Sequence, residues 1–199
     1  MGKNEENVRK YRVLSPIYDL FARNPLIEKP RQRQFELAAI RPGDRVLVVG
    51  VGTGLDLELV PADARVTGID LSADMLRQAE LKVRRDDWTL LRMNAEQLEF
   101  DDDSFDVVVM NCILSVVADP TKALSEAARV LAPMGSIWIL GKFIETPPSL
   151  PRRALSSALV AIGGADLTRS LTRTIGTTPL RTARHERALI ADIIQLTPA

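Results

Sequence analysis

A glycine-rich turn and an aspartate after a second apolar run are the residues of this sequence best suited to binding chemistry. The apolar run 46–49 leads into the turn 50–54, which holds three glycines, and the run 66–69 ends at Asp70. Glycines allow a ligand to lie against the backbone, close to the amino end of the following helix. A carboxylate at the end of the next strand can accept hydrogen bonds from both hydroxyls of a ribose. Together these features predict a frame that binds a nucleoside.

The spacing of the glycines distinguishes between two classes of ligand. The dinucleotide fingerprint G-x-G-x-x-G would place its third glycine at position 55, where this chain has Leu55. The glycines fall instead at Gly50, Gly52 and Gly54. This spacing disfavours a nicotinamide oxidoreductase and favours a nucleoside-containing methyl donor. For the glycine turn taken alone, a tight structural turn without a ligand is the alternative.

Short apolar segments alternate with helical patterns along the middle of the chain. The segments expected to form strands are 46–49, 66–69, 89–93, 105–110 and 136–140. Such alternation predicts an α/β fold, a mostly parallel sheet with helices on both faces. Ligands of these folds bind at the carboxyl ends of the strands, beside the switch in strand order. Gly50, Asp70, Asn94 and Asn111 all lie at such ends.

Helical periodicity and turn residues predict the remaining elements. An amphipathic helix is expected over 3–23, and Pro30 is expected to open a second helix. Ser72 is the expected cap of a helix over 73–83. The other expected elements are a short helix over 55–59, an exposed turn over 101–104, a helix over 121–131 and a closing hairpin over 183–196.

The length and composition of the chain predict a single domain and argue against binding to nucleic acid or spanning a membrane. At 199 residues and 46% hydrophobic, the chain suits a single domain with a full core. Its expected parts are N-terminal helices (1–40), a cofactor-binding core (41–145) and an acceptor-side or membrane-facing segment (146–199). Lysine plus arginine equal aspartate plus glutamate at 26 each, so net charge predicts no nucleic-acid partner. No apolar run approaches the roughly 20 residues that span a bilayer.

The cysteine content and the spacing of potential metal ligands bear on disulfides, cellular location and metal binding. The single cysteine, Cys112, excludes an internal disulfide and permits a cytoplasmic location. Because Cys112 adjoins an apolar run, we expect it to be a small buried core residue. No cluster of histidine, cysteine, aspartate and glutamate has the spacing of a metal site, so no metal is expected.

Three motifs resemble those of a known family in order and spacing. They are Val46-Leu47-Val48-Val49-Gly50-Val51-Gly52-Thr53-Gly54, Gly68-Ile69-Asp70-Leu71-Ser72, and Asn94-Ala95-Glu96 followed by Phe105-Asp106. Over roughly residues 8–145 the chain resembles the class I S-adenosylmethionine-dependent methyltransferases. The resemblance implies a Rossmann-like, mostly parallel seven-stranded sheet with an antiparallel C-terminal strand. It also implies S-adenosyl-L-methionine as cofactor and S-adenosyl-L-homocysteine as product.

The resemblance assigns roles to residues of these motifs. The glycines would flank the methionine part of the cofactor, Asp70 would hold the ribose, and Met75 would cover the adenine. Asn94 and Ala95 match the position that reads the adenine amino group. The family usually has aspartate at Asn94, but an amide can also hydrogen-bond there. The predicted cofactor site comprises Tyr18, Gly50, Gly52, Thr53, Gly54, Asp70, Leu71, Met75, Asn94, Ala95 and Asn111.

Two segments are most similar to two groups within that family. Residues 15–19 and 111–120 resemble the bacterial phosphatidylethanolamine N-methyltransferases and the ubiquinone/menaquinone C-methyltransferases. The residues of the glycine turn and the short length favour the phospholipid enzymes. In both groups an N-terminal tyrosine helps to close the cofactor pocket. Tyr18 is therefore the candidate lid and catalytic residue, with Tyr11 as second choice and core packing of Tyr18 as the alternative.

Val48 departs from the family pattern, which nearly always has glutamate or aspartate two residues before the first glycine. In the family that carboxylate usually helps to place the amino group of the cofactor's methionine part. A valine there implies weaker cofactor binding, a substitute group elsewhere, or a module that binds the cofactor without transferring its methyl group.

The acceptor of the methyl group must be inferred from residues near the C-terminus. An amine acceptor needs no strong base, and for the single histidine, His185, a structural role in a strand is favoured over a base. The segment 151–176 predicts either peripheral binding to an anionic membrane or a lid over the substrate, because it places Arg152, Arg153, Arg169 and Arg173 among apolar residues. The expected acceptor is a phospholipid headgroup such as phosphatidylethanolamine. The alternative is C- or O-methylation of a quinone-like or other small molecule, and the sequence does not specify the oligomeric state.

Overall fold

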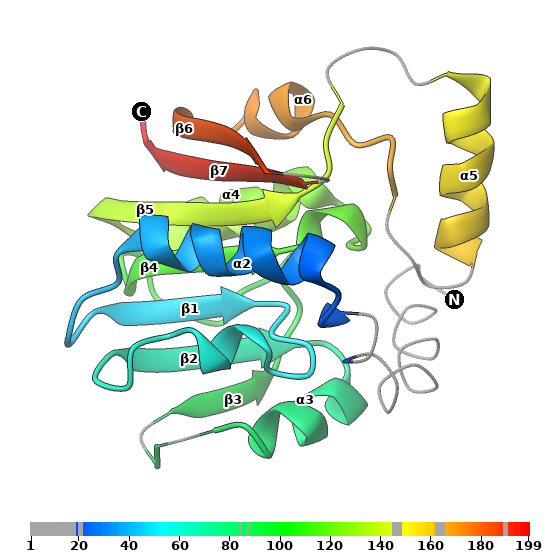
Figure 1. Cartoon of the computed structure of the whole chain (residues 1–199). Helices are drawn as coiled ribbons and strands as arrows, with labels where there is room; N and C mark the ends of the chain where they lie inside the picture. Colours follow the sequence, from blue (N-terminus) through cyan, green and yellow to red (C-terminus); the bar gives the residue numbers. More distant parts are fainter. Residues whose placement is uncertain are drawn as a thin grey trace.

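A seven-stranded, mostly parallel sheet forms the centre of the molecule (Figure 1). The computed structural model describes residues 19, 22–83, 85–86, 88–144, 149–161, 166–188 and 191–199. The strands lie in the order β3-β2-β1-β4-β5-β7-β6. Their bounds are β1 (Arg45–Val49), β2 (Arg65–Asp70), β3 (Thr89–Arg92), β4 (Phe105–Asn111), β5 (Leu131–Gly141), β6 (Leu180–Ala188) and β7 (Ala191–Pro198). The expected α/β fold is confirmed.

The central strands form from aliphatic and β-branched runs that are buried on both faces of the sheet. β1 reads Arg-Val-Leu-Val-Val and β4 reads Phe-Asp-Val-Val-Val-Met-Asn. β1 pairs in parallel with β2 on one side and with β4 on the other. Because the chain continues from β1 to β2 and from β4 to β5, the strand order reverses between β1 and β4. Ligands of such sheets bind at the carboxyl ends of these two strands.

The chain closes with the hairpin that the sequence predicts. β6 and β7 pair with each other in antiparallel orientation, and β7 pairs antiparallel with β5. The sheet is therefore parallel from β3 to β5 and antiparallel at its C-terminal edge.

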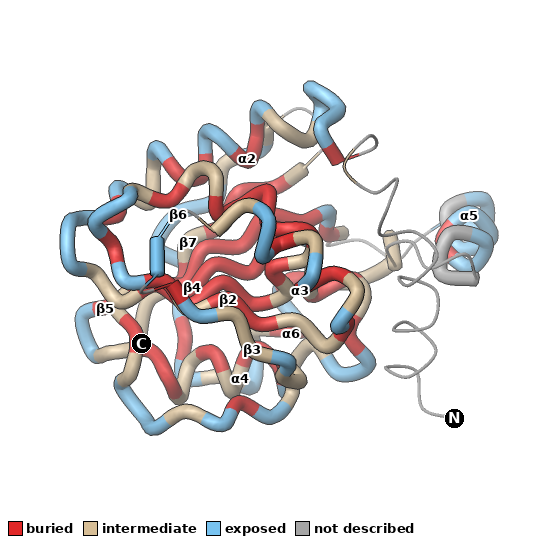
Figure 2. Tube along the Cα trace, turned by 90° about the horizontal axis from the view of Figure 1, so that it is seen from below, coloured by how far each residue is buried: buried red, intermediate tan, exposed pale blue. Residues whose placement is uncertain are grey.

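Helices cover both faces of the sheet (Figure 2). They are α2 (Pro25–Ala38), α3 (Ala73–Glu80), α4 (Pro120–Val130), α5 (Leu150–Ala161) and α6 (Leu171–Ile175). On one face Phe35 of α2 and Leu76 of α3 pack with Val48 of β1. On the opposite face Leu124 of α4 packs with Leu47 of β1. Successive residues of β1 thus serve two cores, as the alternation of a strand requires.

Several helix and strand boundaries differ from the sequence-based expectations. α2 begins at Pro25 rather than at Pro30, because the side chain of Asn24 accepts a hydrogen bond from the N–H of Leu26 and caps the helix. The segment expected as a short helix over 55–59 is a single 3-10 turn, η1 (Asp56–Glu58). β5 follows α4 without a loop, so it begins earlier than expected. The expected Ser72 cap is confirmed, although α3 ends sooner than residue 83.

α5 stands beyond the carboxyl ends of the parallel strands, apart from the two helix layers (Figure 1). Leu150 and Leu155 of this helix are 79% and 55% exposed. Ser156, on the other side of α5, is buried. Among the described residues no helix is long and apolar enough to cross a membrane.

Candidate functional site

The turn after β1 contains three left-handed glycines, and one of them faces open space. Gly50, Gly52 and Gly54 have φ angles of 73°, 56° and 84°. A Cβ atom on Gly50 would lie 2.7 Å from the side chain of Ile113, and one on Gly54 would lie 2.9 Å from the Cα of Ala79. On Gly52 the nearest atom of the described residues would be 3.9 Å away. Gly50 and Gly54 therefore allow close packing of neighbouring elements, whereas Gly52 leaves a surface that a ligand can approach.

Asp70 ends β2 directly beside this turn. One carboxylate oxygen accepts a hydrogen bond from the N–H of Gly52 at 3.0 Å, and the other accepts one from the N–H of Ser72 at 2.8 Å. Burial raises the pKa of Asp70, and these backbone donors partly oppose the rise. Each carboxylate oxygen keeps a further lone pair, so the fixed carboxylate can accept from two neighbouring hydroxyls. This geometry suits the ribose role predicted for Asp70.

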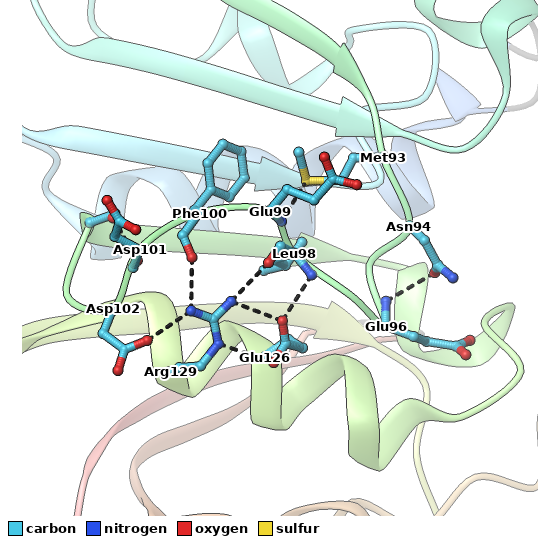
Figure 3. A network of polar contacts seen from close by, with 11 residues as sticks. Met93, Asn94, Glu96, Leu98, Glu99, Phe100, Asp101, Asp102, Glu126 and Arg129 are labelled. Carbon is cyan, nitrogen blue, oxygen red and sulfur yellow. Dashed lines mark hydrogen bonds and ion pairs between the residues drawn. The ribbon is translucent and has the colours of Figure 1, made fainter.

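Asn94 and Ala95 lie in the loop that follows β3 (Figure 3). Oδ1 of Asn94 accepts a hydrogen bond from the N–H of Glu96 at 3.0 Å. The side chain of Ala95 is buried in the core on the α4 face. Glu96 accepts from the N–H of Ala118 at 2.8 Å and so connects this loop with the loop after β4. Asn94 is thus held at the edge of the sheet where Asp70 and the glycine turn also lie.

A network centred on Arg129 of α4 fixes the following part of the same loop (Figure 3). Its guanidinium donates to the carbonyl oxygens of Leu98 at 2.9 Å and Phe100 at 2.8 Å. It also pairs with Glu126 at 2.9 Å and with Asp102 at 2.8 Å. Hydrogen bonds from Arg129 hold the pKa of Glu126 below its usual range. The network stabilises the backbone that presents Asn94.

Three residues, which we call the clasp, connect Asp19, the glycine turn and the end of α3: Asp19, Thr53 and Lys82. Oγ1 of Thr53 donates to Asp19 at 2.5 Å, and Nζ of Lys82 lies 2.9 Å from the other carboxylate oxygen of Asp19. Lys82 also donates to the carbonyl oxygen of Thr53 at 2.5 Å. Although partial burial raises it, these hydrogen bonds hold the pKa of Asp19 below its usual range.

A buried ion pair borders the same turn, and no sequence pattern indicated it. Nε of Arg31, from α2, lies 3.0 Å from Asp56 of η1, and their side chains are 10% and 9% exposed. Nδ2 of Asn111, at the end of β4, donates to the other oxygen of Asp56 at 3.0 Å. Burial raises the pKa of Asp56, which Arg31 and Asn111 oppose. Of these three residues, only Asn111 could be predicted from the sequence, because it lies at the end of a strand.

The other residues singled out from the sequence differ in burial, and two of them lie outside the described residues. Met75 is buried at the start of α3, and Leu71 is half-buried next to Asp70. Tyr18 and Tyr11, the lid candidates, lie outside the described residues. Cys112 was expected to be buried, and this is wrong because its side chain is exposed. Its φ angle of 60° turns the backbone out of β4, so the residue leaves the core.

Two C-terminal residues have roles within the fold. Nε2 of His185 lies 3.0 Å from the buried carboxylate of Asp192, which joins β6 to β7. This is the structural role that the sequence favoured. Arg169 was expected in a basic, membrane-facing segment, but it pairs with Asp166 at 3.1 Å and donates to the carbonyl oxygen of Val117. Arg169 is therefore directed into the protein.

The described groups fit the cofactor that the sequence motifs imply. Gly52 offers an open surface, and Asp70 offers a fixed pair of acceptors beside it. Oδ1 of Asn111 is buried without a hydrogen-bond partner among the described residues, as expected where a ligand donor is missing. Within those same residues, no group of three or more histidine, cysteine, aspartate and glutamate side chains could hold a metal ion.

Comparison with known proteins agrees with the fold and with a methyltransferase domain. A family model described as "Methyltransferase domain" matches residues 47–139. The phosphatidylethanolamine N-methyltransferase of Cereibacter sphaeroides is 42% identical over 131 residues, which are 64% of this chain and 64% of that protein. The ubiquinone/menaquinone biosynthesis C-methyltransferase of Bdellovibrio bacteriovorus is 35% identical over 115 residues, 55% of this chain and 49% of that protein. The chain thus spans less than two thirds of either relative.

A solved structure extends the likeness over nearly the whole chain. The methyltransferase chain in a complex with the Haloferax volcanii Trm112 methyltransferase activator has a TM-score of 0.78 at 19% identity. The match covers 94% of this chain and 97% of that one. At such identity it shows a shared fold. Residues 47–139 thus match a methyltransferase domain, and the sheet has the Rossmann-like fold of the class I S-adenosylmethionine-dependent methyltransferases.

Proposed function

We propose that this chain binds S-adenosyl-L-methionine at the carboxyl ends of β1, β2 and β4 and transfers its methyl group. The observation that carries the proposal is the half-buried carboxylate of Asp70, held by the N–H of Gly52 beside the open surface of that glycine. Asp70 would accept from the ribose hydroxyls, and Asn94 would read the adenine. Gly52 and Thr53 would line the path of the methionine part.

The chemistry demands positioning more than acid–base catalysis. Bound S-adenosylmethionine supplies a sulfonium methyl group that a nucleophile displaces in line. With an amine acceptor, the nitrogen lone pair forms the new C–N bond while the C–S bond breaks, which leaves the thioether of S-adenosylhomocysteine. The methylated nitrogen then loses a proton to water. The residues of the chain have to orient both partners and exclude water from the reacting atoms.

We infer that the acceptor is the amine of a phospholipid headgroup, such as phosphatidylethanolamine. The relative at 42% identity has that activity by name. α5 adds physical support, because its exposed leucines and the exposed Arg153 suit a surface of apolar chains and anionic headgroups. Peripheral binding to a membrane is part of this proposal.

A chain of hydrogen bonds connects α5 to the end of β4. Oγ of Ser156 donates to Asp166 at 2.9 Å, and the N–H of Asp166 donates to the carbonyl oxygen of Ser115 at 3.0 Å. Ser115 ends the turn η2 (Ile113–Ser115), which directly follows Asn111 and Cys112. These hydrogen bonds therefore hold α5 to the segment after β4, at the switch point where the proposed cofactor site lies.

The test measures transfer of labelled methyl groups to vesicles. Vesicles of phosphatidylethanolamine and phosphatidylglycerol should accept label, and vesicles in which phosphatidylcholine replaces phosphatidylethanolamine should not. Leu155→Glu should reduce transfer to vesicles and leave the affinity for S-adenosylhomocysteine unchanged. Leu26→Glu is the matched control, because Leu26 is also exposed but belongs to α2. Cofactor binding without transfer to any lipid amine would contradict the phospholipid proposal.

A quinone-like acceptor is the second candidate, supported by the relative from Bdellovibrio bacteriovorus. C-methylation requires removal of a proton from the acceptor, and a base for that step would have to lie near the site. Label that enters extracted quinones instead of lipid amines would favour this candidate.

A binding module without transferase activity is the third candidate, and it rests on Val48. This side chain is 0% exposed and lies in the apolar layer between α2 and the sheet, so β1 supplies no carboxylate. Calorimetry with S-adenosylmethionine and S-adenosylhomocysteine on the wild type and on Val48→Glu tests this candidate. Tight binding without turnover in both proteins would favour the module.

A further inference from the structure

A buried acceptor at the proposed cofactor site lacks a donor. Oδ1 of Asn111 has no hydrogen-bond partner among the described residues, although Nδ2 of the same amide donates to Asp56 at 3.0 Å. Asn111 is 9% exposed, so bulk water does not readily replace the missing partner. A buried polar atom left unpaired destabilises a fold unless a ligand or an ordered water pairs with it. The unpaired oxygen therefore points to a donor from a bound molecule.

The surroundings of this oxygen favour a donor with positive charge. Asp56 accepts from Asn111 on one oxygen and pairs with Arg31 on the other, which leaves further lone pairs on its carboxylate. Arg31 stabilises the ionised carboxylate, yet burial still raises the pKa of Asp56. A second cation beside Asp56 would complete the stabilisation of its charge.

We propose that Asp56 and Asn111 together bind the α-ammonium group of the cofactor's methionine part, and that Arg31 positions Asp56. This inference rests on the function proposed above. Asp56 lies two residues after Gly54, and Asn111 ends β4, the strand beside β1, so both come from the elements that carry the proposed cofactor site. The carboxylate that β1 lacks at Val48 is thus supplied by the turn that follows it.

The test compares ligands that differ at the ammonium group. Calorimetry would use S-adenosylhomocysteine, its analogue without the amino group, and 5′-methylthioadenosine, which lacks the whole amino-acid end. Asp56→Asn and Asn111→Leu should each weaken S-adenosylhomocysteine about 10- to 100-fold, the range for a lost hydrogen bond to a charged group. Both should leave 5′-methylthioadenosine within about 2-fold of its wild-type affinity. The analogue without the amino group should bind the wild type, Asp56→Asn and Asn111→Leu with the same low affinity.

Matched variants separate recognition from folding. Glu58→Gln changes another carboxylate of the same turn, one paired with Arg23 on the surface, and should alter none of the affinities. Asp56→Asn leaves the charge of Arg31 buried, so the double variant Arg31→Met/Asp56→Asn, which removes the pair together, carries the test if the single variant does not fold. Asn111→Leu leaves the ion pair intact in either case.

Three results would overturn the inference and leave the proposed function standing. Equal losses for S-adenosylhomocysteine and 5′-methylthioadenosine would mean a structural role only, and unchanged affinity for both would mean no role. A wild type that binds both ligands equally well would overturn the ammonium site but not the proposed function. A wild type that binds neither ligand would overturn the proposed function itself.

Discussion

Lys82 and Asp19 form an ion pair of 2.9 Å that holds Asp19 against the glycine turn. Lys82 follows α3, and its Nζ also donates to the carbonyl oxygen of Thr53 within the turn. The pair is partly shielded from solvent, with side chains that are 17% and 34% exposed. The clasp therefore couples a segment outside the sheet to the backbone that would face the cofactor.

We expect Lys82→Met to loosen that coupling. The affinity for S-adenosylhomocysteine should fall about 3- to 10-fold, and the free energy of unfolding should fall by about 0.5–1 kcal/mol, as for a partly exposed pair. Calorimetry and urea denaturation measure the two quantities. Arg77→Met is the matched control, because Arg77 of α3 pairs with Asp74 on the surface. Equal effects of both variants would show that the clasp has no special role.

The lowered pKa of Asp19 determines how the stabilisation contributed by the clasp depends on pH. The ordinary value is 3.8, and the folded value lies below it. Asp19 therefore contributes its full stabilisation above pH 3.8, and this is lost as the pH falls through the folded pKa. The stability difference between wild type and Lys82→Met should be constant between pH 6 and pH 8. A difference that changes over this range would point to another titrating group.

The three glycines of the turn should respond differently to alanine. Gly54→Ala should lower the free energy of unfolding by about 3 kcal/mol or more, because the new Cβ would lie 2.9 Å from the Cα of Ala79 at a positive φ. Gly52→Ala meets no such neighbour, so it should cost about 1–2 kcal/mol from the left-handed backbone alone. Its main effect should be a loss of cofactor affinity of about 10-fold or more, because the methyl group would occupy the open surface.

Gly43→Ala is the control for backbone strain. Gly43 has a φ angle of 83°, and a Cβ there would meet nothing within 4 Å. It precedes β1, at the opposite edge of the sheet from the proposed site. Gly43→Ala should therefore cost as much stability as Gly52→Ala and leave cofactor affinity unchanged. If Gly52→Ala binds the cofactor as the wild type does, the ligand does not lie over Gly52.

Hydrophobic periodicity was sufficient to predict the sheet and the strand-end residues of the site. Apolar runs mark the ends of β1, β2 and β4, and parallel strands bring those ends to one edge, so Gly52, Asp70 and Asn111 could be grouped without coordinates. The C-terminal hairpin followed from its alternation. These predictions depend on local patterns that the fold preserves.

The parts that sequence patterns missed depend on long-range contacts. Arg31 resembles any charged residue on a helix, and only the packing of α2 over η1 makes it the partner of Asp56. Cys112 was placed in the core because its neighbours are apolar, but a left-handed turn moves it outward. The sequence predicts a helix start at Pro30, but the helix begins at Pro25 because the side chain of Asn24 caps it there.

The raised pKa of Asp70 predicts that binding of the adenosine part weakens as the pH falls. Ribose hydroxyls need an ionised acceptor, so affinity should fall as the pH decreases through a pKa above 3.8. Folding has the opposite dependence: the buried carboxyl favours the fold below pH 3.8, and this contribution is lost as the pH rises through the raised pKa. Calorimetry with 5′-methylthioadenosine from pH 7.5 to pH 5 isolates Asp70, because this ligand has no ammonium group for Asp56. Asp70→Asn should bind weakly without this pH dependence, and a pH profile like that of the wild type would contradict the assignment.

Arg129→Met should destabilise the protein and disturb the loop that carries Asn94. The variant leaves Glu126 and the carbonyl oxygens of Leu98 and Phe100 without their charged donor, so the free energy of unfolding should fall by about 2 kcal/mol. The affinity for 5′-methylthioadenosine should also fall, because the loop after β3 would be less well ordered. Lys122→Met, an exposed change on the same helix, should alter neither quantity. Lost stability with unchanged affinity would show that the loop does not contribute to adenine binding.

Gln34→Met should stabilise the protein, which is unusual for a change in a core. Gln34 is 1% exposed, and both Nε2 and Oε1 lack hydrogen-bond partners among the described residues. Methionine has a similar shape and leaves no buried polar group unpaired, so the free energy of unfolding should rise by about 1 kcal/mol and the Tm by about 2–4 °C. Gln32→Met is the matched control, because Gln32 is exposed on the same helix and should change the Tm little. A lower Tm for Gln34→Met alone would mean that an ordered water or a ligand pairs with the amide of Gln34, one turn of α2 away from Arg31.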